Sequence, residues 1–351
     1  MKGFRSVLKA LGSSKSSGTI LRAPPQDGSG SNERRFQKRV FLHIGAHKTA
    51  TTTIQRNIKK NRDVLALKYD IYVFDDGEIY NSDLGAHFKK ISQGKLSDDK
   101  FDASIVKARC YLESRLDEIN NDKILISWEG FLGHSSLDHY EGIYTHIDSV
   151  TESIRRIFGN HTLRILTVIR RQDDFIESCY LQQIKEGRSL SFSEFFEKID
   201  ISKLSWLELM DSLNKVFPNR LAVCTFERIK TDGTEVFLEY CLSKLFEFEI
   251  DAVDFAIVNR ANASLSEKGV DISRELLPQV IANDRPELNR IIFRNFSNSK
   301  YGKAKYFDEF TRRFLIDKYR QDNKALFDKY VLNHESNLPS DPVDLQCWQY
   351  Y

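Results

Sequence analysis

An apolar run gives way to a hydroxyl-rich one in the stretch Leu42-His43-Ile44-Gly45-Ala46-His47-Lys48-Thr49-Ala50-Thr51-Thr52-Thr53. This pattern predicts a buried β-strand, a short loop and the first turn of an α-helix. The free N–H groups of such a turn, the positive end of the helix dipole, a lysine and several hydroxyls would converge on one phosphate-sized anion. We therefore predict an anion-binding loop formed by Gly45, His47, Lys48, Thr49, Ala50, Thr51, Thr52 and Thr53, with His47 in a positioning role at most.

The loop does not have the Walker A spacing, which requires four residues between its glycines and then Gly-Lys-Ser/Thr. Only two residues separate Gly45 from Lys48, and Ala50 stands where a second glycine is expected. Because a methyl group favours right-handed backbone angles, we expect such angles at Ala50 and a slightly looser loop. A strand followed by a Thr-capped helix, with Lys48 in solvent, explains the same residues without a ligand.

A second strand, from Leu163 to Ile169, ends at Arg170 and leads into another predicted helix. Ser178 follows Arg170 by eight residues, so its hydroxyl would lie about two helical turns onward. An arginine at this position can clamp a phosphate in a bidentate fork. It can equally pair with Asp173 or Asp174 at the surface. We expect the neighbouring Arg171 to point to solvent.

These two segments resemble the PAPS-dependent sulfotransferases. That family carries Lys-Thr-Gly-Thr-Thr in a strand-loop-helix for the 5′-phosphosulfate, and an Arg at a strand end with a Ser eight residues later for the 3′-phosphate. The first segment is most similar to the bacterial and carbohydrate branch, with His-Ile-Gly-x-x-Lys-Thr-Gly-Thr-Thr-x-x-Gln ending here at Gln55. The segment Asn262-Ala263-Ser264-Leu265-Ser266 is similar to Asn-x-Ser-Leu-Ser of the same branch.

The resemblance implies that PAPS is the donor and that no metal is required. Lys48 and the threonines would hold its 5′ end, and Arg170 and Ser178 its 3′-phosphate. Lys48 would also stabilise the charge that develops on the leaving phosphate. Sulfuryl transfer is analogous to phosphoryl transfer, so positioning and electrostatics would provide most of the catalysis.

An acceptor hydroxyl must lose a proton, and two residues are candidates for the base. His87 resembles a histidine that follows the second strand in related bacterial sequences, and its ordinary pKa suits the task. Glu129 follows a predicted strand and should therefore lie at the ligand-binding edge. Each has a structural alternative: His87 on a helix surface, or Glu129 paired with Lys123. We expect His43 to be a buried core residue.

Composition is ordinary for a globular protein of one main domain. The 351 residues carry 52 basic and 50 acidic side chains, which does not favour nucleic-acid binding. We predict a disordered basic tail at 1–39, an α/β domain at 40–335 and a C-terminal tail at 336–351. The scattered cysteines, the lack of a long apolar run and the polar N-terminus predict a cytoplasmic protein with reduced thiols and no transmembrane segment. Basic and apolar residues near the N-terminus allow a weak peripheral membrane contact.

Beyond residue 40, predicted strands alternate with predicted helices, which is typical of an α/β fold. We expect a P-loop-like open parallel sheet flanked by helices, with a helical C-terminal portion from about Leu265. Predicted strands are 40–44, 71–74, 123–127, 163–169 and 220–225. Predicted helices are 52–66, 104–119, 146–158, 173–187, 203–216, 234–246, 308–319 and 322–330.

The function predicted from these residues is transfer of the PAPS sulfonate to a hydroxyl acceptor. The branch resemblance makes a carbohydrate or glycolipid acceptor the most plausible, although no single residue specifies it. Two alternative functions would also use such anion sites. One is a P-loop kinase-like phosphotransferase that uses ATP, and the other is a nucleotide-binding module without catalysis.

Overall fold

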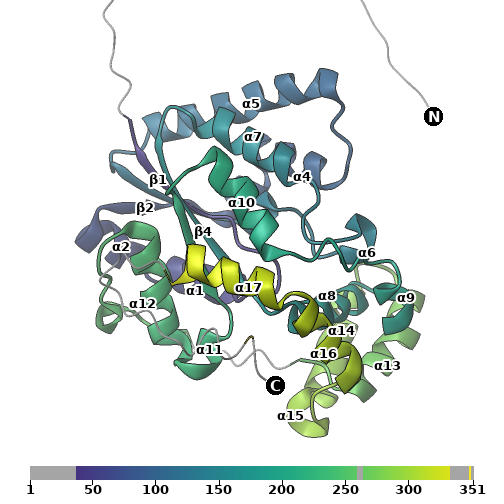
Figure 1. The fold of residues 1–351 in the computed structure, drawn as a ribbon. Helices are drawn as coiled ribbons and strands as arrows, with labels where there is room; N and C mark the ends of the chain where they lie inside the picture. The colour runs from purple at the N-terminus through teal and green to yellow at the C-terminus, as the bar shows by residue number, and fades with distance from the viewer. Residues whose placement is uncertain (1–36, 259–263, 333–347, 349–351) are drawn as a thin grey trace, which may run out of the picture. The chain divides into compact units, whose positions relative to one another are not determined.

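The computed structural model describes residues 37–258, 264–332 and Trp348. Its centre is a sheet of five parallel strands in the order β2-β3-β1-β4-β5 (Figure 1). This order places β1 between β3 and β4. The carboxyl ends of all five strands therefore meet at one edge, where ligands bind in open parallel sheets. The strands are β1 Arg39–His43, β2 Ile71–Val73, β3 Lys123–Ser127, β4 Thr162–Ile169 and β5 Leu221–Thr225.

All five strands match the predicted segments to within a residue at each end, which confirms the predicted fold class. The strands are almost continuously apolar because both faces of the sheet are covered. Successive side chains of β1 show this: Val40 and Leu42 pack into one hydrophobic cluster, and Phe41 packs into a second cluster on the other face.

Helices cover both faces of the sheet. On the face of Val40 lie α4, α5, α7, α8 and α10, and on the face of Phe41 lie α1, α2 and α12 (Figure 1). The helices are α1 Thr51–Lys60, α2 Arg62–Tyr69, α3 Asp76–Tyr80, α4 Asp83–Ser92, α5 Asp98–Asp117, α6 Leu137–Tyr140, α7 Ile147–Phe158, α8 Gln172–Lys185, α9 Phe192–Phe196, α10 Trp206–Val216, α11 Arg228–Thr231, α12 Gly233–Phe246, α13 Glu267–Leu276, α14 Arg285–Asn295, α15 Asn298–Tyr301, α16 Glu309–Lys318 and α17 Arg320–Leu326. Short turns of other helix types are η1 Glu129–Phe131, η2 Ala252–Asp254, η3 Leu277–Gln279 and η4 Phe327–Val331.

The predicted helix 52–66 is wrong in one respect, because it is divided into α1 and α2 at Asn61. The Asn61 side chain is buried and donates to the carbonyl of Asn57 at 2.8 Å. Its amide oxygen accepts from the backbone N–H of Ala256 at 2.7 Å. The helix is thus interrupted at Asn61, whose side chain contacts a distant segment. Asparagine side chains commonly compete with the helical backbone for hydrogen bonds in this way.

The C-terminal helices pack against α8, the helix that follows β4. Figure 1 shows α13, α14 and α16 gathered beside α8, away from the sheet.

In the part of the chain that the structure describes, no helix combines the length and the apolar character needed to cross a bilayer. Residues 1–36 of the predicted N-terminal tail and most of the C-terminal tail lie outside the described residues. The predicted boundary at residue 39 is slightly too late, because Lys38 is buried and Arg39 begins β1. Trp348 is described and buried, with its indole N–H donating to Glu227 at 2.9 Å.

Candidate functional site

The loop between β1 and α1 has an unusual backbone. Lys48 and Ala50 both have φ of 65°, the left-handed region that favours glycine. The expectation of right-handed angles at Ala50 is therefore wrong. For a residue with a Cβ this conformation costs about 1–2 kcal/mol, so the surrounding structure imposes it. Alternating backbone handedness turns successive N–H groups toward one point, which forms an anion-binding nest.

The N–H groups of this nest are open. Among the described residues, the backbone N–H groups from Lys48 to Thr52 donate to no carbonyl or side chain, whereas the next one, of Thr53, donates to the carbonyl of Ala50 at 2.8 Å. Ala50 is the N-cap of α1 and provides no side-chain cap. The helix thus begins with unpaired donors at its positive end, as the sequence predicts.

Two threonine hydroxyls close the loop from within. Thr49 and Thr51 are buried, and both donate to the carbonyl of Ala46, at 2.6 and 2.9 Å. Gly45 permits this tight closure, since a Cβ there would lie 2.8 Å from the Thr51 hydroxyl. Thr52 is exposed and Thr53 half-buried. The Thr51 hydroxyl therefore shapes the loop, and the backbone rather than this hydroxyl faces the nest.

Arg170 lies directly against the lysine loop. Its Nη1 donates to the carbonyl of Lys48 at 3.0 Å, and its guanidinium packs on the ring of Phe226 at 4.4 Å. Nη2 lies 3.9 Å from a carboxylate oxygen of Asp174, so the predicted alternative pairing is also present. Nε is buried and has no hydrogen-bond acceptor among the described residues. The structure thus brings the two predicted anion sites together and leaves a donor of Arg170 unused.

Arg171 does not point to solvent, contrary to expectation. Its side chain is only 11% exposed, and its Nε donates to Asp173 at 2.6 Å. Its backbone N–H donates to Glu227 at 3.2 Å. Arg171 is therefore part of a buried ion network that anchors the start of α8.

Ser178 and Gln182 lie one turn apart on helix α8, and Gln182 contacts Lys48. Ser178 is half-buried, and Gln182, one turn further, accepts from Lys48 Nζ at 3.0 Å. Gln182 in turn donates to Glu186 at 2.8 Å. Burial is the main cause that lowers the pKa of Lys48, and Arg170 acts in the same direction. A neutral amide thus anchors the lysine without neutralising it.

Glu129 forms a pair with His47 across the mouth of the loop. Glu129 lies just beyond the end of β3, and its carboxylate is 3.6 Å from His47 Nδ1. It does not pair with Lys123, which lies at the opposite end of β3 and donates to the carbonyl of Tyr69. His47 Nε2 contacts the carbonyl of Gly133 and must donate, because a carbonyl only accepts.

This tautomer lets the pair accept a hydrogen bond from a ligand. Burial lowers the pKa of His47, although Glu129 favours the charged form. Neutral His47 therefore presents a bare Nδ1 to a carboxylate. The Nδ1 atom and the carboxylate oxygen, 3.6 Å apart, are both hydrogen-bond acceptors, so they are stable together when a donor lies between or beside them. A substrate hydroxyl would be such a donor.

His87 is not brought to this site. It is fully buried between α4, α5 and α7, where its ring nitrogens contact the hydroxyls of Ser104 at 2.9 Å and Ser153 at 2.8 Å. Burial lowers the pKa of His87 to about 4. With both nitrogens occupied, His87 is a core residue, so neither its predicted role as base nor the helix-surface alternative fits. His43 is buried as expected and contacts Ser127 at 2.7 Å.

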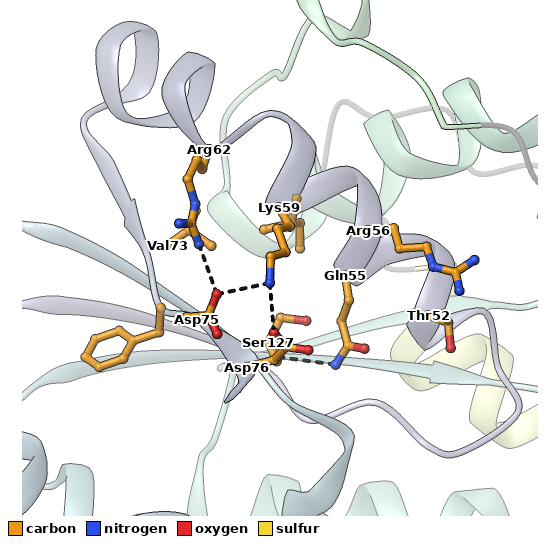
Figure 2. Close-up of a pocket in the computed structure, with 11 residues that line it drawn as sticks. Thr52, Gln55, Arg56, Lys59, Arg62, Val73, Asp75, Asp76 and Ser127 are labelled. Carbon is orange, nitrogen blue, oxygen red and sulfur yellow. Dashed lines mark hydrogen bonds and ion pairs between the residues drawn. The ribbon is translucent and has the colours of Figure 1, made fainter. Parts of the chain in front are cut away.

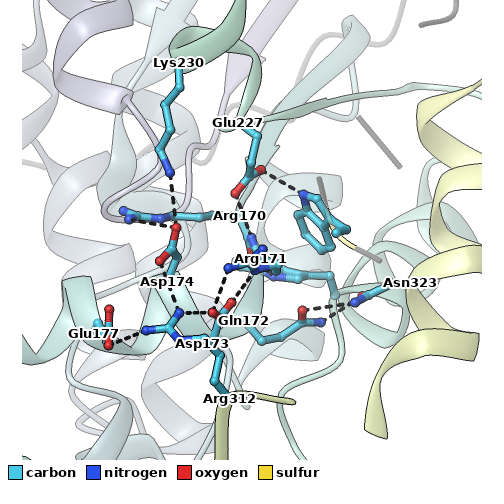
Figure 3. A network of polar contacts seen from close by, with 12 residues as sticks. Arg170, Arg171, Gln172, Asp173, Asp174, Glu177, Glu227, Lys230, Arg312 and Asn323 are labelled. Carbon is cyan, nitrogen blue, oxygen red and sulfur yellow. Dashed lines mark hydrogen bonds and ion pairs between the residues drawn. The ribbon is translucent and has the colours of Figure 1, made fainter. Parts of the chain in front are cut away.

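Sequence reasoning missed several residues that complete the site. Lys230 reaches Asp174 beside Arg170 at 3.2 Å (Figure 3). Lys303 reaches the same carboxylate at 3.4 Å. Lys230 could have been found, because it closely follows the end of β5 at the ligand-binding edge. Gln182 could have been found from its four-residue spacing to Ser178. Lys303 carries no such signal, since only tertiary packing brings its segment to α8.

A pocket of about 150 Å³ lies between α1 and the segment that ends β2, and it shares Thr52 with the loop (Figure 2). Gln55 and Ser127 line it, but Lys48 and Arg170 do not. Two of its three cations, Lys59 and Arg62, are already paired with Asp75, at 3.1 and 3.6 Å. The predicted Gln55 of the loop motif thus contacts β3 through Ser127, at 3.3 Å, rather than the nest.

The third predicted segment is only partly described. Asn262 and Ala263 lie outside the described residues. Ser266 caps α13 by accepting from the N–H of Gly269 at 3.1 Å, and Leu265 is buried. The described part of the segment therefore has a structural role.

Comparisons with known proteins give little further information. No protein-family model and no curated protein matches the chain. Among solved structures, it is similar to a crystal structure of retinol dehydratase in complex with androsterone and inactive cofactor PAP. The identity is 11%, over 85% of this chain and 82% of that chain, with a TM-score of 0.35.

Proposed function

We propose that the protein transfers the sulfonate group of PAPS to a hydroxyl of an acceptor. The observation that carries the proposal is the 3.0 Å contact between Arg170 and the carbonyl of Lys48. It joins a lysine-centred nest and an arginine-centred site at neighbouring strand ends. A donor with anionic groups at its 5′ and 3′ positions needs two such sites side by side. The open N–H groups of the loop and the unused Nε of Arg170 fit these groups.

In this proposal the loop binds the 5′ end of the donor. The backbone N–H groups from Lys48 to Thr52 hold its non-bridging oxygens, and Thr52 and Thr53 add hydroxyls. PAPS supplies an activated sulfonate whose leaving group is a phosphate. Lys48 moves from Gln182 toward the oxygen that bears the growing negative charge, a movement that a neutral hydrogen bond permits at little cost.

Arg170 and Ser178 hold the 3′-phosphate, and Lys230 and Lys303 add positive charge beside them. This arrangement distinguishes the donor from ATP, which lacks a 3′-phosphate. It is also the feature that separates the proposal from a kinase-like phosphotransferase.

Glu129 accepts the proton of the acceptor hydroxyl, and His47 Nδ1, 3.6 Å away, provides a second hydrogen-bond acceptor beside it. Glu129 has the more accessible side chain, with 34% exposure against 16% for His47. Its position beyond β3, next to the loop that begins after β1, lets an acceptor approach the sulfonate from the side opposite the leaving phosphate. The polar side chains of His134, Gln182 and Glu186 near Lys48 suit an acceptor rich in hydroxyls, and we therefore propose a carbohydrate or glycolipid.

Incubation with ³⁵S-labelled PAPS and a panel of hydroxyl acceptors tests the proposal. We expect a labelled sulfate ester and adenosine 3′,5′-bisphosphate in equal amounts, and much less of both from the Lys48→Met variant. Parallel reactions with labelled ATP and magnesium separate the kinase alternative. Binding of the bisphosphate with no transfer to any acceptor would favour the non-catalytic module.

A further inference from the structure

Asp174 is shared by four cations from four parts of the chain. Its carboxylate lies 3.9 Å from Arg170, 3.2 Å from Lys230, 3.4 Å from Lys303 and 3.6 Å from Arg312. Arg170 ends β4, Lys230 lies on α11, Lys303 precedes α16 and Arg312 lies on it. Figure 3 shows Lys230 and Arg312 approaching the carboxylate from opposite sides. This single acid therefore lies at the centre of the arginine-centred site.

The two other acids on this face of α8 share Arg312 with Asp174, and Glu177 also lies 3.8 Å from Lys303. Asp173 binds Arg171 and Arg312, and Glu177 binds Arg312 at 2.7 Å and the backbone N–H of Tyr306 at 3.1 Å. These contacts are buried and fasten the segment before α16 onto α8. Asp173 and Glu177 therefore hold the fold together.

The lysine partners of Asp174 are much more exposed to solvent than Asp174 itself. The side chains of Lys230 and Lys303 are 51% and 49% exposed, whereas that of Asp174 is 11% exposed. Burial by itself would raise the pKa of Asp174, but Arg170, Lys230 and Lys303 together hold it well below its usual value. The carboxylate is thus charged, and its lysines can turn to another anion by rotating about their side-chain bonds.

We propose that Asp174 is an internal anion that competes with the nucleotide 3′-phosphate for Arg170, Lys230 and Lys303, and thereby limits how tightly the bisphosphate product is held. The proposal rests on the proposed function, which places the 3′-phosphate at Arg170. A phosphate dianion that enters this site must take over cations already paired with Asp174. It must also lie close to a negative charge, so each binding event carries a penalty that hastens release.

Calorimetric titration of the Asp174→Asn variant tests the competition. Asparagine keeps the size and one acceptor but removes the charge. We expect adenosine 3′,5′-bisphosphate to bind about tenfold more tightly than to wild type, because several partly exposed ion pairs no longer oppose it. Binding of adenosine 5′-monophosphate should be unchanged. Asp232→Asn is the matched control, since Asp232 lies two residues from Lys230 but pairs with Arg228 at 2.9 Å.

Equal or weaker binding of the bisphosphate to Asp174→Asn would overturn the inference, since Asp174 would then only orient Arg170. An equal gain in bisphosphate affinity in Asp232→Asn would also overturn the inference, because any loss of negative charge in this region would then have the same effect. If Asp174→Asn does not fold, the Lys230→Met and Lys303→Met variants provide the test. Wild type should bind the 3′,5′-bisphosphate more tightly than the 5′-monophosphate. If the lysine variants lose this difference, the competition is supported; if they keep it, the competition is refuted. A wild-type protein that binds both nucleotides equally would instead contradict the proposed function itself.

Discussion

Replacing Arg170 by methionine separates the role of the arginine-centred site from that of the lysine loop. The side chain is 11% exposed, it already donates to the Lys48 carbonyl, and its Nε is unused. A phosphate at this site would therefore accept charge-assisted hydrogen bonds from a preorganised guanidinium. Loss of such bonds costs about 2–4 kcal/mol, which corresponds to about 30- to 900-fold weaker binding.

Calorimetry with two nucleotides is the assay. We expect Arg170→Met to lose this affinity for adenosine 3′,5′-bisphosphate and much less for adenosine 5′-monophosphate. Arg164→Met is the matched control, because Arg164 lies on β4, the strand that Arg170 follows, is 17% exposed and pairs with Glu247 at 3.0 Å. Equal losses for both nucleotides would show that Arg170 only shapes the loop. Unchanged affinity for both would remove it from the site.

Three further variants test other parts of the account. Lys48→Ala should lower turnover by about 100-fold or more but weaken bisphosphate binding less than tenfold, because its charge acts mainly as the leaving group departs. Glu129→Gln should lower turnover by about 10²- to 10⁴-fold with donor binding unchanged; full activity would exclude it as base. The pKa of His87 is about 4 in the folded protein and 6.5 in the unfolded chain. Between these two pH values only the unfolded chain binds the proton, so the free energy of unfolding falls as the pH drops from 6.5 to about 4. Urea unfolding at a series of pH values should show that the free energy of unfolding of His87→Gln falls by about 3 kcal/mol less than that of wild type over this range.

The sequence predicted the sheet well because its signals are local. Each strand is a continuous apolar run, and the functional loop follows the first of them. The same locality explains why the position of Arg170 could be predicted, since a residue that follows a strand lies at the ligand-binding edge. The break at Asn61 was not predictable, since its cause is a contact with a segment almost two hundred residues away.

The site was predicted in outline but not in its pairings. Glu129 lies beside the loop as expected, yet its partner His47 was given only a positioning role, because the 3.6 Å contact depends on how β1 and β3 end together. His87 was misassigned for a similar reason: whether a helical histidine faces a cleft or the hydroxyls of two neighbouring helices depends on packing. Ala50 shows a third limit, since the nest imposes a backbone conformation that the residue alone disfavours.

The most direct test is a crystal structure with adenosine 3′,5′-bisphosphate bound. The account predicts the 5′-phosphate on the N–H groups from Lys48 to Thr52, and the 3′-phosphate on Arg170, with Lys230 and Lys303 turned toward it. A nucleotide that is bound elsewhere, or that leaves either site empty, would contradict the claim that these two sites hold opposite ends of one donor.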